Sequence, residues 1–256
     1  MTWLIQDEVF GEEETGLLIN ALTTLGIQHS VITYYDDTVS TGGFIPEDNI
    51  SRGSVEFVCK GHSKHRLLTL ENYNCHRYYP YYHDYLINYD FRFTTWSKLY
   101  SQPDKYFDLF ETDRLFVRPN SGKKIFTGTT FGKKWAQREL DTIQNLPGNS
   151  WISPHELILL STPKKIESEY RILMRGSKPI TWSRYEGETE IPESRIKYFV
   201  GRVTVNNYWP DLFYTMDIAL LSDDSIGIVE FNNLFSAGWY DCEYEAIIKE
   251  VEDAFN

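Results

Sequence analysis

Tyr214-Thr-Met-Asp-Ile-Ala-Leu-Leu221 and Ile226-Gly-Ile-Val-Glu-Phe-Asn232 are two neighbouring segments from which the architecture of this chain can be inferred. Both segments are apolar runs of strand length, and the polar turn 222–225 between them predicts a β-hairpin. Side chains at i and i+2 of a strand point to the same side, so Glu230 and Asn232 point together and Asp217 can lie beside them. Mg²⁺ favours a few carboxylates and fills its remaining positions with phosphate oxygens and water. The hairpin therefore predicts a magnesium site and makes nucleotide chemistry the first hypothesis.

The alternative interpretation of the hairpin is a solvent-exposed strand face, because a lone Glu-x-Asn pattern often arises by chance. A second element is therefore needed, and Phe116-Val-Arg-Pro-Asn-Ser-Gly-Lys-Lys-Ile-Phe-Thr-Gly128 supplies one. It places Arg118 at the end of a strand, then a glycine-containing turn, then two lysines. Such a loop offers backbone N–H groups and cations to a polyphosphate, although an exposed turn with solvated lysines explains it about equally well. It is not a P-loop, because Gly-x-x-x-x-Gly-Lys-Ser/Thr is absent.

The composition is that of a soluble globular protein, with 256 residues of which 41% are hydrophobic and 24% charged. The formal net charge of −12 argues against a broad basic face and hence against general nucleic-acid binding. The three cysteines lack paired spacing, which argues against a disulfide framework. No apolar run approaches the roughly 20 residues that span a membrane, and the first residues lack the basic region of a secretory signal. We therefore expect a cytoplasmic protein.

The opening of the chain predicts a small α/β unit. Residues 3–5 indicate a strand, residues 12–25 an amphipathic helix, and residues 27–34 a second strand. Residues 55–58 indicate a third strand. An order of strand, helix and strand is typical of an α/β domain.

A domain boundary is expected near Pro103, where polar turn residues follow a Tyr-rich segment without clear periodicity. This gives an N-terminal α/β domain of residues 1–105 and a second domain of residues 106–256. The second domain is expected to contain strands at 114–119, 124–131, 157–161, 170–174, 180–185, 214–221 and 226–232, and helices at 133–145, 193–206 and 243–255.

Ordered motifs in the second domain carry a resemblance to a known family. They are Val117-Arg-Pro119 with Lys124-Ile-Phe-Thr-Gly128, Glu169-Tyr-Arg171, Ser183-Arg-Tyr185, and Glu230-Phe-Asn-Asn-Leu-Phe-Ser-Ala-Gly-Trp-Tyr240. In this order they resemble the ATP-grasp superfamily. The resemblance is closest to the divergent clade that includes the eukaryotic cell-division-cycle protein acting in translation initiation factor assembly. It implies an α+β fold, in which two subdomains joined by a linker near 160–165 clasp ATP behind a small N-terminal α/β domain.

The resemblance also implies nucleotide-binding roles. Arg118 resembles the residue, lysine in most of the family, that contacts the α- and β-phosphates, and Lys124 resembles the second phosphate-binding cation of the clade. Glu169 is similar to the acidic residue that binds the ribose hydroxyls. The linker resembles the segment whose backbone pairs with adenine, and the residues it contributes are Leu160, Ser161, Thr162 and Lys165.

Asp217, Glu230 and Asn232 match the magnesium ligands of the family in order and spacing. Because coordination would be their role, replacing them is expected to change stability little. Arg171 and Arg184 lie on strands expected to be adjacent, so both are expected to reach one cleft as catalytic residues. There they would neutralise charge on the γ-phosphate or hold a substrate carboxylate. The alternative is a pair of surface arginines.

Two further patterns have weaker interpretations. The Tyr-rich segment 73–106 suggests either base stacking or, more commonly, core packing. Cys59, His62 and His65, near Cys75, are ligand types that suit zinc, but their spacing matches no usual zinc motif.

The function implied by the resemblance is an ATP- and Mg²⁺-dependent ligase that joins a carboxylate to an amine or thiol through an acylphosphate. Thr215 stands where many of these ligases carry an arginine, and the segment after Asn232 lacks their Ser-Pro-Gly turn. The acceptor therefore stays open between a peptide, a protein and a small metabolite. The alternatives are an ATP-binding assembly factor that clasps a partner protein without ligation, and a scaffold without nucleotide.

Overall fold

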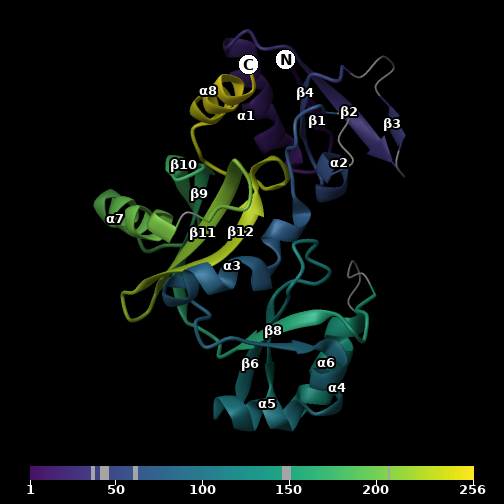
Figure 1. Ribbon diagram of the computed structural model, residues 1–256, viewed down its shortest axis with the longest axis vertical. Helices are drawn as coiled ribbons and strands as arrows, with labels where there is room; N and C mark the ends of the chain where they lie inside the picture. Colours follow the sequence, from purple (N-terminus) through teal and green to yellow (C-terminus); the bar gives the residue numbers. More distant parts are fainter. Residues whose placement is uncertain (36–37, 41–45, 60–62, 146–150, 207) are drawn as a thin grey trace.

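Three four-stranded sheets follow one another along the long axis of the molecule (Figure 1). The computed structural model describes residues 1–256 except 36–37, 41–45, 60–62, 146–150 and 207. Helices accompany each sheet, which confirms the α+β class. Within the described chain, each helix is too short or too polar to span a lipid bilayer.

The N-terminal sheet has the order β3-β2-β1-β4, and its strand β1 is parallel to both β2 and β4. The predicted strand–helix–strand opening is confirmed. The strand predicted at 55–58 is wrong, because the Ser54 hydroxyl accepts a hydrogen bond from the Phe57 backbone N–H (3.2 Å) and caps a helix there. The elements of this unit are β1 (Thr2–Gln6), α1 (Gly11–Thr24), β2 (His29–Tyr35), β3 (Thr38–Ser40), β4 (Asn49–Arg52) and α2 (Val55–Cys59).

The central sheet is fully antiparallel in the order β10-β9-β11-β12. One face packs on helices α3 (Cys75–Tyr82) and α7 (Glu193–Val203), with Tyr78, Ile172 and Met216 in the shared core, and the other face bears the polar side chains of the site. The two hairpins predicted from the sequence are confirmed. The remaining elements are β9 (Ile166–Arg175), β10 (Lys178–Gly187), the 3₁₀ turn η4 (Thr204–Asn206), β11 (Phe213–Leu221) and β12 (Ile226–Asn233).

The Tyr-rich segment is core. Tyr73, Tyr78, Tyr79 and Tyr82 are each at most 5% exposed and pack against the central sheet, so these rings are not free to stack on bases. The segment folds as η1 (Leu70–Tyr73), α3 and η2 (His83–Tyr85).

The third sheet has the order β5-β8-β6-β7 and lies at the far end of the molecule (Figure 1). The strand predicted from residue 124 begins only at Thr129, because Lys124 has a left-handed backbone with φ of 49° and interrupts an extended run. The predicted helix from residue 133 starts as a 3₁₀ turn. The elements are β5 (Arg92–Thr95), α4 (Trp96–Ser101), α5 (Pro103–Phe110), β6 (Arg114–Pro119), β7 (Thr129–Gly132), η3 (Lys133–Trp135), α6 (Ala136–Asn145) and β8 (Leu157–Ser161).

Strand β5 precedes the boundary expected at residue 105, yet it pairs with β8, for example Arg92 with Leu160. The third sheet therefore begins earlier in the sequence than the second domain was expected to begin. The division into residues 1–105 and 106–256 stays a prediction.

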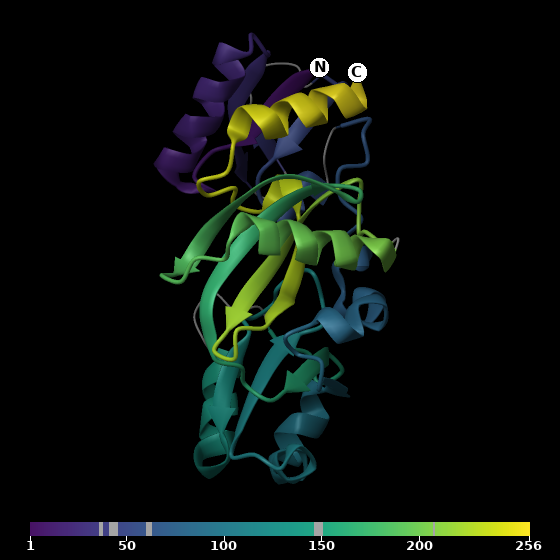
Figure 2. The same cartoon turned by 90° about the vertical axis from the view of Figure 1, so that its left-hand side faces the viewer.

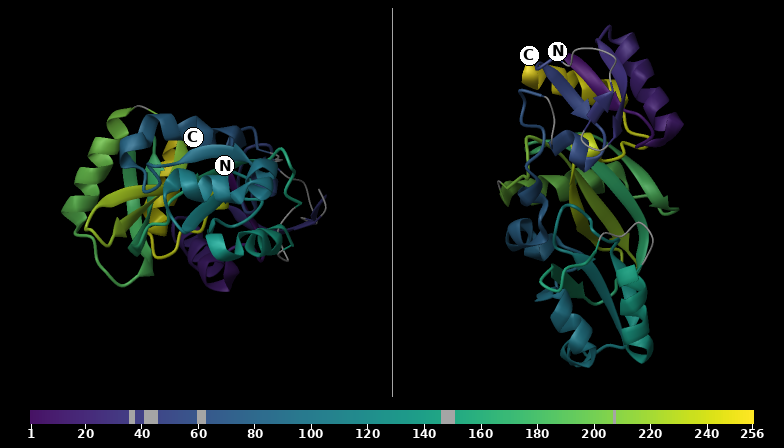
Figure 3. Two further views of the ribbon diagram at one scale, coloured as in Figure 1. Left: turned by 90° about the horizontal axis from the view of Figure 1, so that it is seen from below. Right: turned by 90° about the vertical axis from the view of Figure 1, so that its right-hand side faces the viewer.

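The C-terminal helix α8 (Tyr244–Phe255) returns to the N-terminal unit and packs beside α1 (Figure 2). The two chain termini lie close together at this end of the molecule (Figure 3). Below them, the buried Arg52 forms an ion pair with Glu14 and donates to the carbonyl oxygens of Leu234 (3.1 Å) and Ala237 (2.9 Å). These bonds tie the N-terminal unit to the loop after β12, which includes η5 (Leu234–Ser236).

Candidate active site

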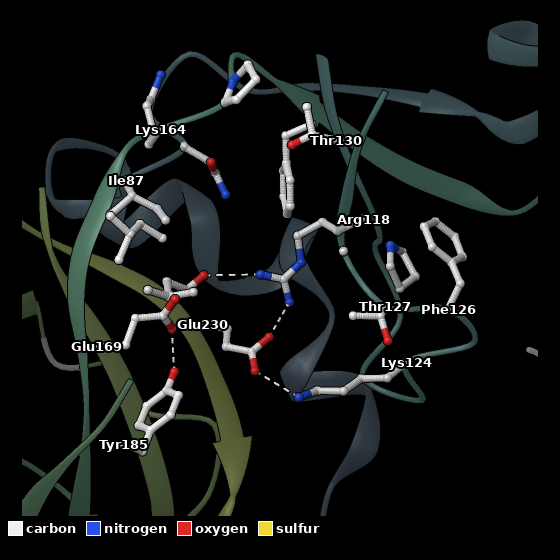
Figure 4. Close-up of a pocket in the computed structure, with 17 residues that line it drawn as sticks. Ile87, Arg118, Lys124, Phe126, Thr127, Thr130, Lys164, Glu169, Tyr185 and Glu230 are labelled. Carbon is white, nitrogen blue, oxygen red and sulfur yellow. Dashed lines mark hydrogen bonds and ion pairs between the residues drawn. The ribbon is translucent and has the colours of Figure 1, made fainter. Parts of the chain in front are cut away.

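A cavity of about 480 Å³ lies between the central and third sheets (Figure 4). Both sheets contribute because strand side chains alternate between two faces. On β6, Leu115 and Val117 point into the core of the third sheet, whereas Phe116 and Arg118 face the cavity. The central sheet contributes acidic and aromatic side chains from the opposite wall.

Glu230 on β12 is the residue at which the two sheets meet. Arg118 Nη2 donates to its Oε2 (2.7 Å) and Lys124 Nζ to its Oε1 (2.8 Å), while Arg118 Nη1 donates to the Val229 carbonyl oxygen (3.1 Å) (Figure 4). Burial by itself would raise the pKa of Glu230, but Lys124 and Arg118 outweigh it and hold that pKa below its ordinary value. The carboxylate therefore stays charged at neutral pH.

Asp217 lies directly across the hairpin from Glu230 and is 1% exposed. It receives two hydrogen bonds from Arg171, from Nε to Oδ1 (2.8 Å) and from Nη2 to Oδ2 (2.6 Å). Burial would lower the pKa of Arg171, but Asp217 outweighs it and raises that pKa. The third donor, Arg171 Nη1, binds the carbonyl oxygen of Gly238 (2.9 Å), so Arg171 joins β9 and β11 to the loop after β12.

The structure brings Asp217, Glu230 and Asn232 together. Asn232 Nδ2 donates to Asp217 Oδ2 (3.1 Å) and to Glu230 Oε1 (3.0 Å), so one amide bridges both carboxylates. Thr215, across the hairpin from Asn232, has a buried hydroxyl without a hydrogen-bond partner in the described chain. Two carboxylates and an amide are donors that suit Mg²⁺, once the amide turns its oxygen toward the ion. The residues present therefore fit the metal, although their role as ligands stays a prediction.

Glu169 lies on the same face of β9 as Arg171, and it lines the cavity. The Tyr185 hydroxyl donates to its carboxylate, and burial raises the pKa of Glu169 against that hydrogen bond. Tyr185 in turn stacks on Tyr240, with ring centroids 4.8 Å apart, and Arg171 lies over both rings. Tyr185 is a site residue that sequence analysis missed as such, although it stands in the Ser183-Arg-Tyr185 motif.

The expected linker divides into residues inside and outside the cavity. The backbone of Leu160 pairs with both β5 and β6, and Ser161 donates from Oγ to Asn88 Oδ1 (3.0 Å). Lys165 is 78% exposed and pairs with Glu167. These three residues do not belong to the described lining of the cavity, whereas the neighbouring Pro163 and Lys164 do.

Lys164 and Asp90 form a polar anchor beneath the linker. Asp90 Oδ2 accepts from the Thr162 backbone N–H (3.0 Å), and Asp90 Oδ1 accepts from Lys164 Nζ (3.1 Å). Burial would raise the pKa of Asp90, but the hydrogen bonds from Thr162 and Lys164 lower it. Sequence analysis missed Asn88 and Asp90 because they lie in the Tyr-rich segment, where no period assigns a face.

Arg184 does not reach the cleft. In the β9–β10 register it pairs with Tyr170, whereas Arg171 pairs with Ser183, so the two arginines point to opposite faces of the sheet. Arg184 donates to the carbonyl oxygen of Glu188 at the end of β10. The expectation that both arginines reach one cleft is therefore wrong, because a one-residue offset reverses the direction of a strand side chain.

The zinc interpretation gains no geometric support. His62 lies outside the described residues, and His65 Nε2 contacts Asp48 Oδ1 (3.0 Å). Within the described residues, no group of three or more His, Cys, Asp or Glu side chains is arranged to hold a metal ion.

A second cavity, of about 250 Å³, adjoins the first on the other side of Arg118 and Lys124, which line both. It lies among the N-terminal unit, the turn after β6 and the loop after β12. Its charged lining residues within the described chain are all cations: Arg118, Lys123, Lys124 and Arg171.

Comparison with known proteins identifies the family. The sequence model of an ATP-grasp domain, the second family of its clade, matches residues 95–250, which is more than half of the chain. The chain belongs to the ATP-grasp family. The match begins at residue 95, the last residue of β5, and ends within α8. The finer resemblance to the clade of the eukaryotic cell-division-cycle protein stays a prediction.

Solved structures share this ATP-grasp fold at low sequence identity. They include the D-cycloserine synthetase DcsG (TM-score 0.64, 13% identity, covering 100% of this chain and 99% of that one). The macrocyclase MdnC from Microcystis aeruginosa MRC, bound with precursor peptide MdnA, has a TM-score of 0.56 and 13% identity, with 99% and 100% coverage. The ATP-grasp ligase PsnB, complexed with a phosphomimetic variant of minimal precursor, Mg and ADP, has a TM-score of 0.56 and 12% identity, with 100% and 97% coverage. A search of curated proteins found no match.

Proposed function

We propose that this ATP-grasp protein is an ATP- and Mg²⁺-dependent ligase that joins a carboxylate to an amine or a thiol through an acylphosphate. The observation that carries the proposal is the meeting of Arg118 and Lys124 with Glu230 between two sheets, beside a cavity of about 480 Å³. Cations on one wall and carboxylates on the other suit a magnesium-bound polyphosphate. The complex of the neighbour PsnB with Mg and ADP supports the same pair of ligands here.

In this proposal the nucleotide lies along the larger cavity. Arg118 and Lys124 bind the phosphates, and Glu169 accepts hydrogen bonds from the ribose hydroxyls. The linker 160–165 lies beside the base, with Lys164 at the cavity wall. Asp217, Glu230 and Asn232 would hold Mg²⁺, which neutralises charge on the phosphates during transfer.

The smaller cavity is proposed as the site of the acceptor carboxylate. Its four cationic lining residues, without an Asp or Glu among the described ones, form a local positive region in a chain of net charge −12. Arg171 is fully bonded to Asp217 and Gly238, so it shapes this cavity, whereas the exposed Lys123 is available to an anion. Opposite charge in a concave site favours binding of carboxylates.

The reaction follows from this arrangement. An acceptor carboxylate oxygen attacks the γ-phosphorus, the bond to the β,γ-bridging oxygen breaks, and ADP leaves. An amine nitrogen or thiolate then attacks the acyl carbon, and inorganic phosphate leaves while the amine loses a proton. Arg118 and Lys124 contribute by alignment and charge, which supply most of the catalysis in phosphoryl transfer.

The test is to incubate the protein with ATP, Mg²⁺ and pooled carboxylic acids and amines or a cell extract. We expect phosphate release that depends on an acceptor, together with a product whose mass equals acid plus amine minus water. Glu230→Gln should abolish both signals. Lys133→Met is the matched control, because Lys133 pairs with Asp108 away from both cavities.

Two results would overturn the proposal. Nucleotide-dependent capture of a protein partner without phosphate release would favour an assembly factor. Absence of any nucleotide binding would favour a scaffold.

A further inference from the structure

Both carboxylates of the proposed metal site are already occupied by protein cations. The two oxygens of Glu230 accept from Arg118 and Lys124, and the two oxygens of Asp217 accept from Arg171. Asn232 presents its amide N–H groups, not its oxygen, to the same carboxylates. Each potential ligand must therefore change partner before a metal ion can bind.

The charges in direct contact favour an anion over a cation. Three cations, Arg118, Lys124 and Arg171, face two carboxylates, and four of these five side chains are at most 17% exposed. A divalent cation entering alone would meet an excess of positive charge in a weakly screened site. A polyphosphate would meet an attractive one.

Lys124 is the mobile member of this cluster. Its side chain is 53% exposed and extends from the turn after β6, whereas Arg118 is 12% exposed and also bonded to the Val229 carbonyl oxygen. A lysine side chain with three rotatable donors can move between neighbouring acceptors without a change of backbone. Lys124 is therefore the residue that can leave Glu230 first.

We propose that Lys124 and Arg118 exchange partners during binding, so that the metal enters only with the nucleotide. Without nucleotide they neutralise Glu230 and exclude a free divalent cation. With nucleotide they move to the phosphates and release Glu230 to the metal. This inference rests on the proposed function and adds an obligatory order of binding to it.

Asn232 and Thr215 complete the exchange. When the Asn232 amide turns its oxygen to the metal, its N–H groups need a new acceptor. Residues directly opposite in an antiparallel pair have Cβ atoms about 5 Å apart, and Thr215 holds that position with a buried hydroxyl that lacks a partner in the described chain. The unpartnered hydroxyl thus has a use only in the metal-bound arrangement.

The experiment measures binding of Mn²⁺, which takes the same oxygen ligands as Mg²⁺ and is counted by its paramagnetic resonance signal. Wild-type protein should leave millimolar Mn²⁺ free without nucleotide, and should retain Mn²⁺ once the non-hydrolysable analogue AMPPNP is added. Lys124→Met should bind Mn²⁺ without nucleotide at least about tenfold more tightly than the wild type, because one repelling charge is gone. Lys124→Arg should restore the wild-type pattern.

The matched control is Lys123→Met, which removes the same charge from the adjacent residue. The described ion pairs of Glu230 involve Arg118 and Lys124, so Lys123→Met should leave Mn²⁺ free without nucleotide. Thr215→Val should weaken retention of Mn²⁺ in the presence of AMPPNP. Circular dichroism verifies that each variant is folded.

The exchange is overturned if wild-type protein binds Mn²⁺ equally well with and without AMPPNP, while AMPPNP still binds. It is also overturned if Lys124→Met and Lys123→Met have the same affinity for Mn²⁺ alone. If wild-type protein binds no AMPPNP under any metal condition, the proposed function itself fails, and the exchange fails with it.

Discussion

Asp217→Asn should destabilise the protein, because it leaves a buried guanidinium without its counter-ion. Asp217 is 1% exposed and Arg171 6%. Removing one partner of a buried ion pair typically costs about 3–5 kcal/mol. The asparagine oxygen still accepts one hydrogen bond, and the Gly238 carbonyl oxygen keeps another, so we expect the lower end, about 3 kcal/mol. At roughly 2–4 °C per kcal/mol, Tm falls by about 6–12 °C.

The assay is equilibrium unfolding in urea followed by circular dichroism, for wild type, Asp217→Asn, Arg171→Met and the double variant. The double variant should recover much of the free energy of unfolding, because it contains no unpaired buried charge. The reasoning is refuted if Asp217→Asn loses less than about 1 kcal/mol, the size of an ordinary single hydrogen bond. It is equally refuted if the double variant is no more stable than either single variant.

Three further predictions concern the same site. The Glu230 pKa is lowered because Lys124 and Arg118 outweigh burial, so the pair stabilises the fold above the ordinary carboxyl pKa of about 4.5, and this stabilisation is lost as the pH falls. Unfolding free energies measured from about pH 6 to pH 3 should therefore decline less steeply for Glu230→Gln than for the wild type. Asp90→Asn releases Thr162 and Lys164, so calorimetry should show severalfold weaker nucleotide binding, and an unchanged affinity would contradict the anchoring role. Arg184→Ala should leave nucleotide affinity and acceptor-dependent phosphate release unchanged, since its side chain points away from the cleft; a loss of turnover would reverse that conclusion.

The sequence predicts the central hairpins and the meeting of Asp217, Glu230 and Asn232 because strand periodicity and hairpin pairing are local properties. Arg118 could be placed for the same reason, since an alternating strand sends it away from the core. The side to which Arg184 points could not be predicted, because it depends on the register of β9 against β10, which a single sequence does not specify.

Partners that are distant in the sequence were also beyond prediction. The bidentate contact of Arg171 with Asp217 joins residues 46 positions apart, and Asp90 reaches Thr162 across 72 positions. Because the Arg171–Asp217 pair is buried, the sequence-based expectation that replacing Asp217 changes stability little gives way to a substantial loss. Helix α2 was missed because the serine cap at residue 54 outweighs the strand propensity of the residues that follow it.

The central claim is that ATP binds with Mg²⁺ between the central and third sheets, with Arg118 on its phosphates. Isothermal titration calorimetry of the wild type, Arg118→Ala and the control Lys133→Met tests it most directly. We predict saturable binding of one ATP per chain in the presence of Mg²⁺, with Arg118→Ala weaker by at least about tenfold and Lys133→Met unchanged. Absence of saturable heat for the wild type, or equal affinity in Arg118→Ala, would contradict the claim.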